Sequence, residues 1–189
     1  LGVYSQFLRG EVQVCASVEE VGKAREYAGK NDDPGVLVYP IPYLEPDLVR
    51  TELSDDNEAL ERTHQAVMAR RNSGDMRPAI VMAHAFIVGA VPSDSERNIE
   101  VGGVASVSAQ TFETFGGAKV VPEPGLSYVA LGHLHRPQEV LAAHVPMRYS
   151  GSPIAYSFSE APGDKSAVVI DTLGAEGNKA VDVSLIGIP

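Results

Sequence analysis

The chain has 189 residues, of which 44% are hydrophobic, and this is enough to form one domain around a single core. No apolar run approaches the roughly 20 residues that cross a bilayer, and the N-terminus has neither the basic start nor the apolar stretch of a signal peptide. The net charge of −10 disfavours nucleic-acid binding by this chain alone, because phosphate neutralisation needs a basic face, although a divalent metal site or a basic partner would change that.

The first segment carries the only cysteine and a hairpin signal. Cys15 excludes an internal disulfide and indicates a reducing, cytoplasmic environment. It lies in the apolar run 12–16, which alternates like a short strand, so we expect its thiol to be buried and inert. A turn signal at 31–35 precedes an apolar run, and together they predict a β-hairpin over 22–39. Pro40 is expected to end the second strand of this hairpin.

The strongest helix signal covers 58–71. Acidic cap candidates precede it, and Leu60 and Val67 lie on its apolar stripe. The run 72–74 contains Asn, Ser and Gly, which predicts the end of the helix. The run 79–83 is short and continuously apolar, as expected for a strand that is buried on both faces.

The second half of the chain alternates loops with short strands. A short helix is predicted over 108–115, followed by an exposed Gly/Pro-rich excursion over 116–125. The run 128–131 predicts a second buried strand, and later strands are predicted over 145–149, 167–171 and 181–186. Strands and helices mixed in this way indicate an α/β fold.

Histidines follow both buried strands, where each strand meets a loop. His84 follows the first strand, and the second ends in Gly132, His133, Leu134 and His135. Open sheets collect ligands beyond their strand ends. In extended chain His133 and His135 would point to one side while Leu134 packs inward, so each imidazole could serve one member of a metal pair. Glycine at 132 would remove the side chain that crowds this approach.

A structural role for these histidines is the competing interpretation, since His-x-His alone is a weak signal. His64 lies mid-helix among charged neighbours and is expected to be solvated, and His144 has no partner signal. The acidic pairs at 32–33 and 55–56 are explained by a turn and a helix cap. No carboxylate shows metal-ligand spacing, although a two-metal hydrolytic site needs a bridging carboxylate and further oxygen ligands.

Several motifs taken together resemble the SbcD family of nuclease subunits, which belongs to the calcineurin-like metallophosphoesterase superfamily. The resemblance covers nearly the whole chain, and it rests on the combined run rather than on His-x-His. The matching segments are YPIPYLEP at 39–46, Ala83-His84, Ser95-Glu96-Arg97 followed by Val101-Gly102-Gly103, YVALGHLHRPQ at 128–138, YSGSP at 149–153 and SFSE at 157–160.

The resemblance implies a four-layer α/β/β/α sandwich with two divalent ions, manganese or similar, between strand ends. Residues 1–189 would be a partial metallophosphoesterase domain, the C-terminal part of that sandwich. Matched motif to motif, His84 and His133 would bind one metal and His135 the other.

The resemblance also predicts what lies outside this chain. The family's other metal ligands come from Asp-x-His, Gly-Asp and Gly-Asn-His-Asp motifs, which it places upstream, together with the histidine that serves as general acid. No catalytic residue is therefore assigned here. The family's capping domain would lie downstream. Arg136 is a candidate phosphate contact, with a plain surface role as the alternative.

The resulting hypothesis is a metal-dependent DNA exo/endonuclease subunit for DNA repair, acting with an SbcC-like ATPase and touching no membrane. The fragment alone is expected to be inactive. One alternative is a metallophosphoesterase acting on a nucleotide or small phosphoester, and another is a non-catalytic interaction module. Strands 79–83 and 128–131 are expected to have an open edge, which predicts self-association.

Overall fold

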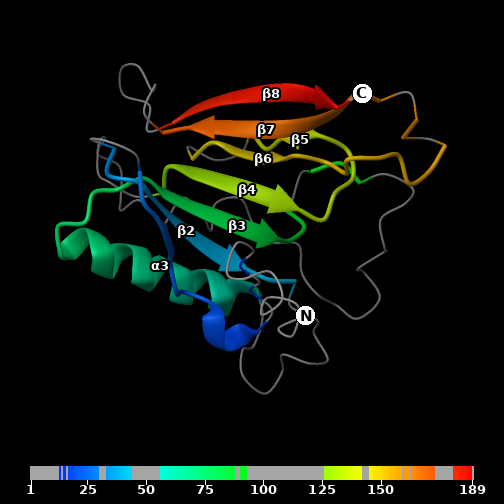
Figure 1. Ribbon diagram of the computed structural model, residues 1–189. Helices are drawn as coiled ribbons and strands as arrows, with labels where there is room; N and C mark the ends of the chain where they lie inside the picture. The colour runs from blue at the N-terminus through cyan, green and yellow to red at the C-terminus, as the bar shows by residue number, and fades with distance from the viewer. Residues whose placement is uncertain are drawn as a thin grey trace.

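The computed structural model describes residues 13, 15, 17–29, 33–43, 56–87, 90–92, 126–141, 145–158, 160–161, 163–172 and 181–188 (Figure 1). These residues form a mixed α/β structure, as the sequence predicts. In chain order the elements are η1 (Val18–Glu20), β1 (Arg25–Tyr27), β2 (Val36–Ile41), α3 (Asp56–Asn72), β3 (Ala79–His84), β4 (Tyr128–Gly132), β5 (Gln138–Glu139), β6 (Met147–Tyr149), β7 (Lys165–Asp171) and β8 (Asp182–Ile188).

The main sheet of the described residues has six strands in the order β1-β2-β3-β4-β6-β5. Strands β2, β3, β4 and β6 run parallel, whereas β1 and β5 are antiparallel edge strands. The predicted hairpin is confirmed as β1 and β2. Gly35 adopts φ +83°, and its N–H donates to Asp33 Oδ1 at 2.8 Å, which fixes the turn.

Helix α3 covers one face of this sheet (Figure 1). Its apolar stripe is buried as predicted, with Leu60 at 2% and Val67 at 1% exposure. Thr63 is also buried, and its hydroxyl donates to the Ala59 carbonyl at 2.9 Å, so no polar atom of this side chain is left unsatisfied. Gly74 adopts φ +86° just past the helix, which confirms the predicted stop.

The two-stranded ribbon β7–β8 lies over the opposite face of the main sheet (Figure 1). Val168 and Ile170 from this ribbon pack on a cluster that contains Ile80 and Tyr128. The described residues thus form three layers, a helix, a sheet and a ribbon. The α/β class is confirmed, and the four-layer sandwich stays a prediction.

Pro40 does not end β2 as predicted, because the strand continues through it to Ile41. Leu37 N–H donates toward β3, to the Pro78 carbonyl at 2.9 Å, so residue 40 directs its backbone nitrogen to the β1 side. The pairing with β1 has already stopped at Val38 opposite Arg25. The donor that proline lacks would therefore have no strand to meet.

The prediction of an open edge at the two buried strands is wrong. Strand β3 pairs with β2 and β4, and β4 pairs with β3 and β6, so both are central. The prediction for β3 also fails in part because Met82 is 52% exposed. The later strands are confirmed, whereas β5 was not predicted. The predicted helix over 108–115, the excursion over 116–125 and most of the strand over 12–16 lie outside the described residues.

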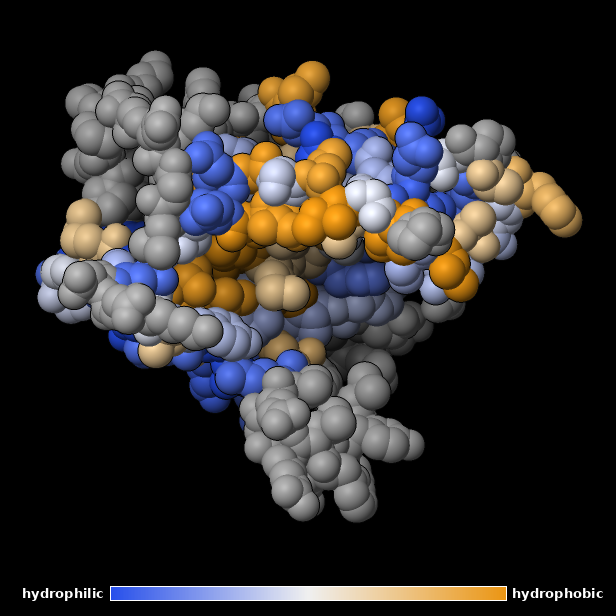
Figure 2. Space-filling model, turned by 45° about the horizontal axis from the view of Figure 1, so that its top comes forward, coloured by the Kyte–Doolittle hydropathy of each residue, from blue (hydrophilic) through white to orange (hydrophobic). Residues whose placement is uncertain are grey.

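Exposed apolar side chains gather instead on the β7–β8 ribbon. Figure 2, in which this side of the molecule comes forward, shows hydrophobic surface above a hollow. Val169, Val183, Leu185 and Ile186 are 40%, 39%, 50% and 58% exposed. The register puts Val169 and Ile186 on one face of the ribbon and Val183 and Leu185 on the other. Self-association stays a prediction. None of the described helices is long and apolar enough to span a bilayer.

The Tyr149 hydroxyl ties β6 to the segment that follows β3. It donates to the Ala85 carbonyl at 2.8 Å and accepts from Ile87 N–H at 2.9 Å. Tyr149 and Ile87 are both 0% exposed, and burial raises the pKa of the Tyr149 hydroxyl. These two hydrogen bonds therefore satisfy the buried Ile87 N–H and the partly buried Ala85 carbonyl, immediately after His84.

Replacing Tyr149 with Phe should lower the free energy of unfolding by about 1–3 kcal/mol, because the Ile87 N–H and Ala85 carbonyl lose their buried partner. Urea denaturation followed by circular dichroism measures the change. Tyr27→Phe is the matched control, since Tyr27 is 44% exposed on an edge strand and should change stability by less than about 0.5 kcal/mol. Equal effects of the two substitutions would show that the two hydrogen bonds of the Tyr149 hydroxyl do not contribute to stability.

Candidate metal centre

The carboxyl ends of the parallel strands β3 and β4 lie side by side at one end of the main sheet. Their register sets His84, the last residue of β3, directly opposite Gly132, the last residue of β4. A Cβ on Gly132 would lie 3.3 Å from Nδ1 of His84. The predicted reason for glycine at this position is therefore supported: a side chain here would crowd the imidazole.

His84 and His133 come together at this edge. Nε2 of His84 lies 3.3 Å from Nδ1 of His133, and the rings are edge to face with centroids 5.2 Å apart. Two nitrogens that each bind one ion at about 2.1 Å, with an angle between 90° and 109°, lie about 3.0–3.4 Å apart. The same distance also fits a ring N–H···N hydrogen bond. The pair thus has the spacing of two ligands of one metal ion.

The backbone at His133 is strained, and this is what aims the imidazole. Strand β4 ends at Gly132, and His133 adopts φ +107°, a value that only glycine takes readily. The chain is therefore not extended at His133, so the predicted reason why His133 and His135 would point to one side is wrong. Its consequence for the residue between them holds, because Leu134 is 2% exposed within the core.

The electrostatics at His84 favour the neutral ring. His84 is exposed at the end of its strand, yet partial desolvation of its ring lowers its pKa, and the neighbouring His133 and His135 lower it further. Tyr43 contributes to this packing, with its ring centroid 5.4 Å from that of His84. A metal binds the neutral imidazole, so the local environment holds His84 in its ligand form at neutral pH.

His135 has a different set of neighbours. Its Nδ1 lies 3.3 Å from Oε1 of Glu160, and the Tyr156 ring lies against it at 4.8 Å between centroids. Within the part of the chain that the structure describes, no three His, Cys, Asp or Glu side chains converge on one possible metal position. The three predicted ligands thus divide into the His84–His133 pair and a separate His135.

Glu160 is the residue at this site that the sequence did not predict. It closes the SFSE segment at 157–160, one of the segments that resemble the SbcD family. Its contact with His135 spans 25 residues of sequence. Position in the chain could not reveal it, because the buried carboxylate reaches the histidine through tertiary packing.

The other candidates lie apart from the histidine pair. Arg136 is exposed beside His135, as a phosphate contact requires, and that role remains a prediction. His64 lies on α3 with Nδ1 4.0 Å from Glu61, and it is half-buried rather than solvated. His144 lies outside the described residues. Cys15 is half-buried rather than buried, and burial raises the pKa of its thiol, which supports the inert interpretation.

Gly74 and Asp75 form a Gly-Asp dipeptide, but Asp75 does not lie where the candidate metal ligands lie. Asp75 precedes the amino end of β3, opposite the end that carries His84. Its carboxylate lies 2.7 Å from Arg77 Nη2, and this hydrogen bond lowers the pKa of Asp75 to about 2. An ion pair with arginine explains this acidic residue.

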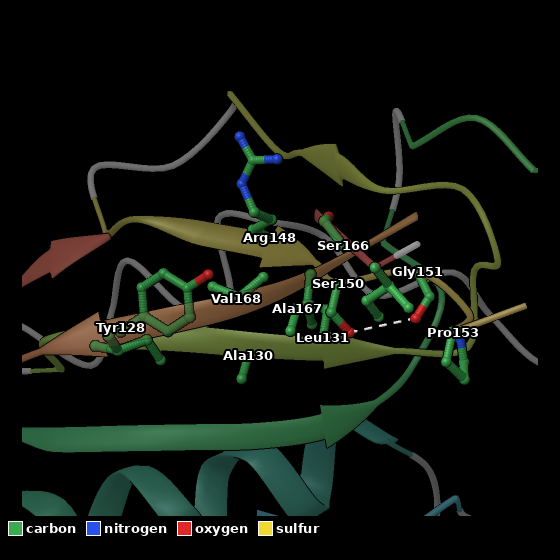
Figure 3. Close-up of a pocket in the computed structure, with 12 residues that line it drawn as sticks. Tyr128, Ala130, Leu131, Arg148, Ser150, Gly151, Pro153, Ser166, Ala167 and Val168 are labelled. Atoms are coloured by element: carbon green, nitrogen blue, oxygen red, sulfur yellow. Dashed lines mark hydrogen bonds between the residues drawn. The ribbon is translucent and has the colours of Figure 1, made fainter. Parts of the chain in front are cut away.

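A cavity of about 360 Å³ lies elsewhere, between the main sheet and the ribbon (Figure 3). Tyr128, Ala130 and Leu131 from β4, Arg148 from β6 and Val168 from β7 line it. Neither histidine nor carboxylate is among its lining residues. The histidines of the candidate metal centre therefore lie outside this cavity.

Comparison with known proteins adds an independent observation. No family model matches the chain. It is 38% identical over 150 residues to the SbcD subunit of the nuclease SbcCD from Bacillus subtilis, which covers 75% of this chain and 35% of that protein. The chain is SbcD-like. The SbcD subunits of Escherichia coli K12 and Staphylococcus epidermidis are each 31% identical, over 156 and 153 residues. The chain spans about a third of the length of these relatives.

Replacing Gly132 with Ala should displace the His84 ring, since the new Cβ would meet Nδ1 at 3.3 Å. We expect Mn²⁺ affinity to fall by up to about 10-fold, while the free energy of unfolding changes by no more than about 1 kcal/mol. Equilibrium dialysis and urea denaturation measure the two effects.

The matched control for Gly132→Ala is Gly187→Ala on β8. A Cβ on Gly187 would meet no atom within 4 Å, so the Mn²⁺ affinity should not change. If Gly132→Ala binds Mn²⁺ as tightly as the parent chain, the close approach at residue 132 has no bearing on a metal site.

Proposed function

We propose that this chain is part of a metal-dependent DNA exo/endonuclease subunit that hydrolyses phosphodiester bonds with two divalent ions, manganese or similar. The observation that supports this most is the His84–His133 pair, with ring nitrogens 3.3 Å apart at the end of two parallel strands. The similarity to SbcD subunits of SbcCD nucleases supports the substrate class.

The residues of this chain would contribute nitrogen ligands. His84 and His133 would hold one ion, and His135 would hold the other. When bound, the ions would supply an activated water and offset charge on the phosphate oxygens. The lowered pKa of His84 keeps a lone pair on its ring available at neutral pH. The strained backbone at His133 fixes the direction of the His133 ring.

The partners follow from the relatives and from charge. Those relatives are subunits of complexes named SbcCD, so we propose an SbcC-like ATPase as partner and DNA as substrate. A net charge of −10 gives this chain little attraction for DNA by itself. DNA contact would therefore depend on bound cations, on the partner and on Arg136 at the exposed edge.

In the full-length gene product, His133→Ala should reduce Mn²⁺-dependent cleavage of duplex DNA by at least about 100-fold, because one ion would lose a ligand from its pair. The 189-residue chain alone should show little or no cleavage, since imidazoles cannot replace the oxygen ligands that a two-metal site needs. Gel assays with and without Mn²⁺ measure both effects.

His64→Ala is the control for His133→Ala, because His64 lies on α3 and should leave cleavage unchanged. Strong cleavage by the 189-residue chain that His133→Ala abolishes would contradict the need for further ligands. Turnover of a chromogenic phosphodiester without any cleavage of DNA would contradict the DNA substrate and favour a small phosphoester.

A further inference from the structure

Glu160 is a buried carboxylate that the proposed chemistry does not use. The residue is 7% exposed, and its side chain is 3% exposed. Burying an ionised carboxylate is costly unless it is paired and hydrogen-bonded. Lys165 supplies the countercharge, with Nζ 3.0 Å from Oε2. The carboxylate is therefore held inside the protein by a specific set of partners.

The two oxygens of Glu160 have different partners. Oε2 accepts from the Lys165 ammonium at 3.0 Å and from the Tyr156 N–H at 3.2 Å. Oε1 faces Nδ1 of His135 at 3.3 Å. The Ser152 hydroxyl also lies 3.4 Å from Oε2, and the ammonium and the N–H at this oxygen can only donate. The carboxylate is thereby oriented, with one defined oxygen toward the histidine.

The backbone of His135 is held by the same group of residues. Its carbonyl accepts from Ser152 N–H at 3.0 Å and from Lys165 Nζ at 3.3 Å. The ammonium also donates to Ser152 Oγ at 2.9 Å, so its three protons have three acceptors. The Ser152 hydroxyl donates to the Ile154 carbonyl at 2.7 Å. Little freedom remains for the histidine or for the carboxylate.

This arrangement determines the tautomer of His135. An ionised carboxylate is an acceptor only, so Nδ1 must carry the proton that it shares with Glu160. In the neutral ring the lone pair then resides on Nε2. Metal-binding histidines characteristically donate their second ring N–H to a carboxylate in this way, which fixes the ring and raises its basicity.

We propose that Glu160 is a positioning residue that holds His135 in the Nδ1–H form and presents Nε2 to a divalent cation. This role rests on the proposed function, because it takes His135 as a metal ligand. Lys165 and Ser152 act one step further out, by holding the carboxylate and the His135 carbonyl in place.

The substitution Glu160→Gln gives a sharp test because the orientation of the amide is dictated. Lys165 and the Tyr156 N–H both need an acceptor, so the amide oxygen must take the Oε2 position. The amide NH₂ then faces Nδ1 of His135 and donates to it. The ring proton must then move to Nε2 of His135, so Nε2 no longer has a lone pair with which to bind a metal ion.

Two measurements on the full-length protein test the role. Nitrogen-15 histidine NMR of the metal-free protein reports the tautomer, with the His135 signals assigned by their loss in His135→Ala. We expect the Nδ1–H form in the parent protein and the Nε2–H form in Glu160→Gln. Equilibrium dialysis with Mn²⁺ alone reports affinity, which should fall about 10- to 100-fold in Glu160→Gln.

Val67→Ala separates positioning from loss of stability. Val67 is buried on α3, and its truncation should destabilise the fold without changing the tautomer or the Mn²⁺ affinity. A structural role for Glu160 alone would make Glu160→Gln behave like Val67→Ala, with the His135 tautomer unchanged, and that result overturns the proposal.

The remaining outcomes distinguish this proposal from the proposed function. If His135→Ala lowers Mn²⁺ affinity but Glu160→Gln does not, the metal centre stands and the positioning role is wrong. If His135→Ala binds Mn²⁺ as well as the parent protein, His135 is not a ligand, and both proposals fail at this residue. A tautomer change together with weakened binding supports both.

Discussion

The parallel pairing of β3 with β4 is the constraint on which the candidate site depends. Its register sets His84 opposite Gly132, so the two strands end level with each other. A shift by one residue would turn every side chain of β4 to the other face. Burial of Val129 and Leu131, at 0% and 3% exposure, opposes such a shift. The core therefore fixes the positions of the histidines that follow it.

Rigidity at the strand ends comes from polar contacts rather than from the core. Tyr149 satisfies backbone groups directly after His84, and Lys165 satisfies the carbonyl of His135. In both places a side chain from a distant segment takes a buried backbone group that regular secondary structure leaves unpaired. The two loops that carry the histidines are thus held by β6 and β7, which lie further along the chain.

Local sequence patterns predicted the elements well where periodicity and turn chemistry act together. The helix, the β1–β2 hairpin and the apolar strands β3 and β4 all have such signals. The continuation of β2 through Pro40 could not be predicted, because it depends on where the neighbouring strand stops. The central position of β3 and β4 was missed for a related reason: it depends on which strands flank them.

For the site, sequence identified the three histidines but not how they divide. Motif position pointed to His84, His133 and His135, whereas the positive φ at His133 and the contact of His135 with Glu160 arise only in the folded chain. The positive φ at His133 and the Glu160 contact at His135 orient the two rings by different means. Backbone strain aims His133, and a hydrogen-bonded carboxylate aims His135.

That difference has a consequence for how the two positions respond to their surroundings. His133 lowers the pKa of its neighbour His84, and a cation between the two rings would relieve the approach of two lone pairs. His135 already has a carboxylate behind it, which makes its ring a stronger donor toward a cation. The ion held by His135 would therefore gain from charge in the protein, whereas the ion held by the pair would gain from geometry.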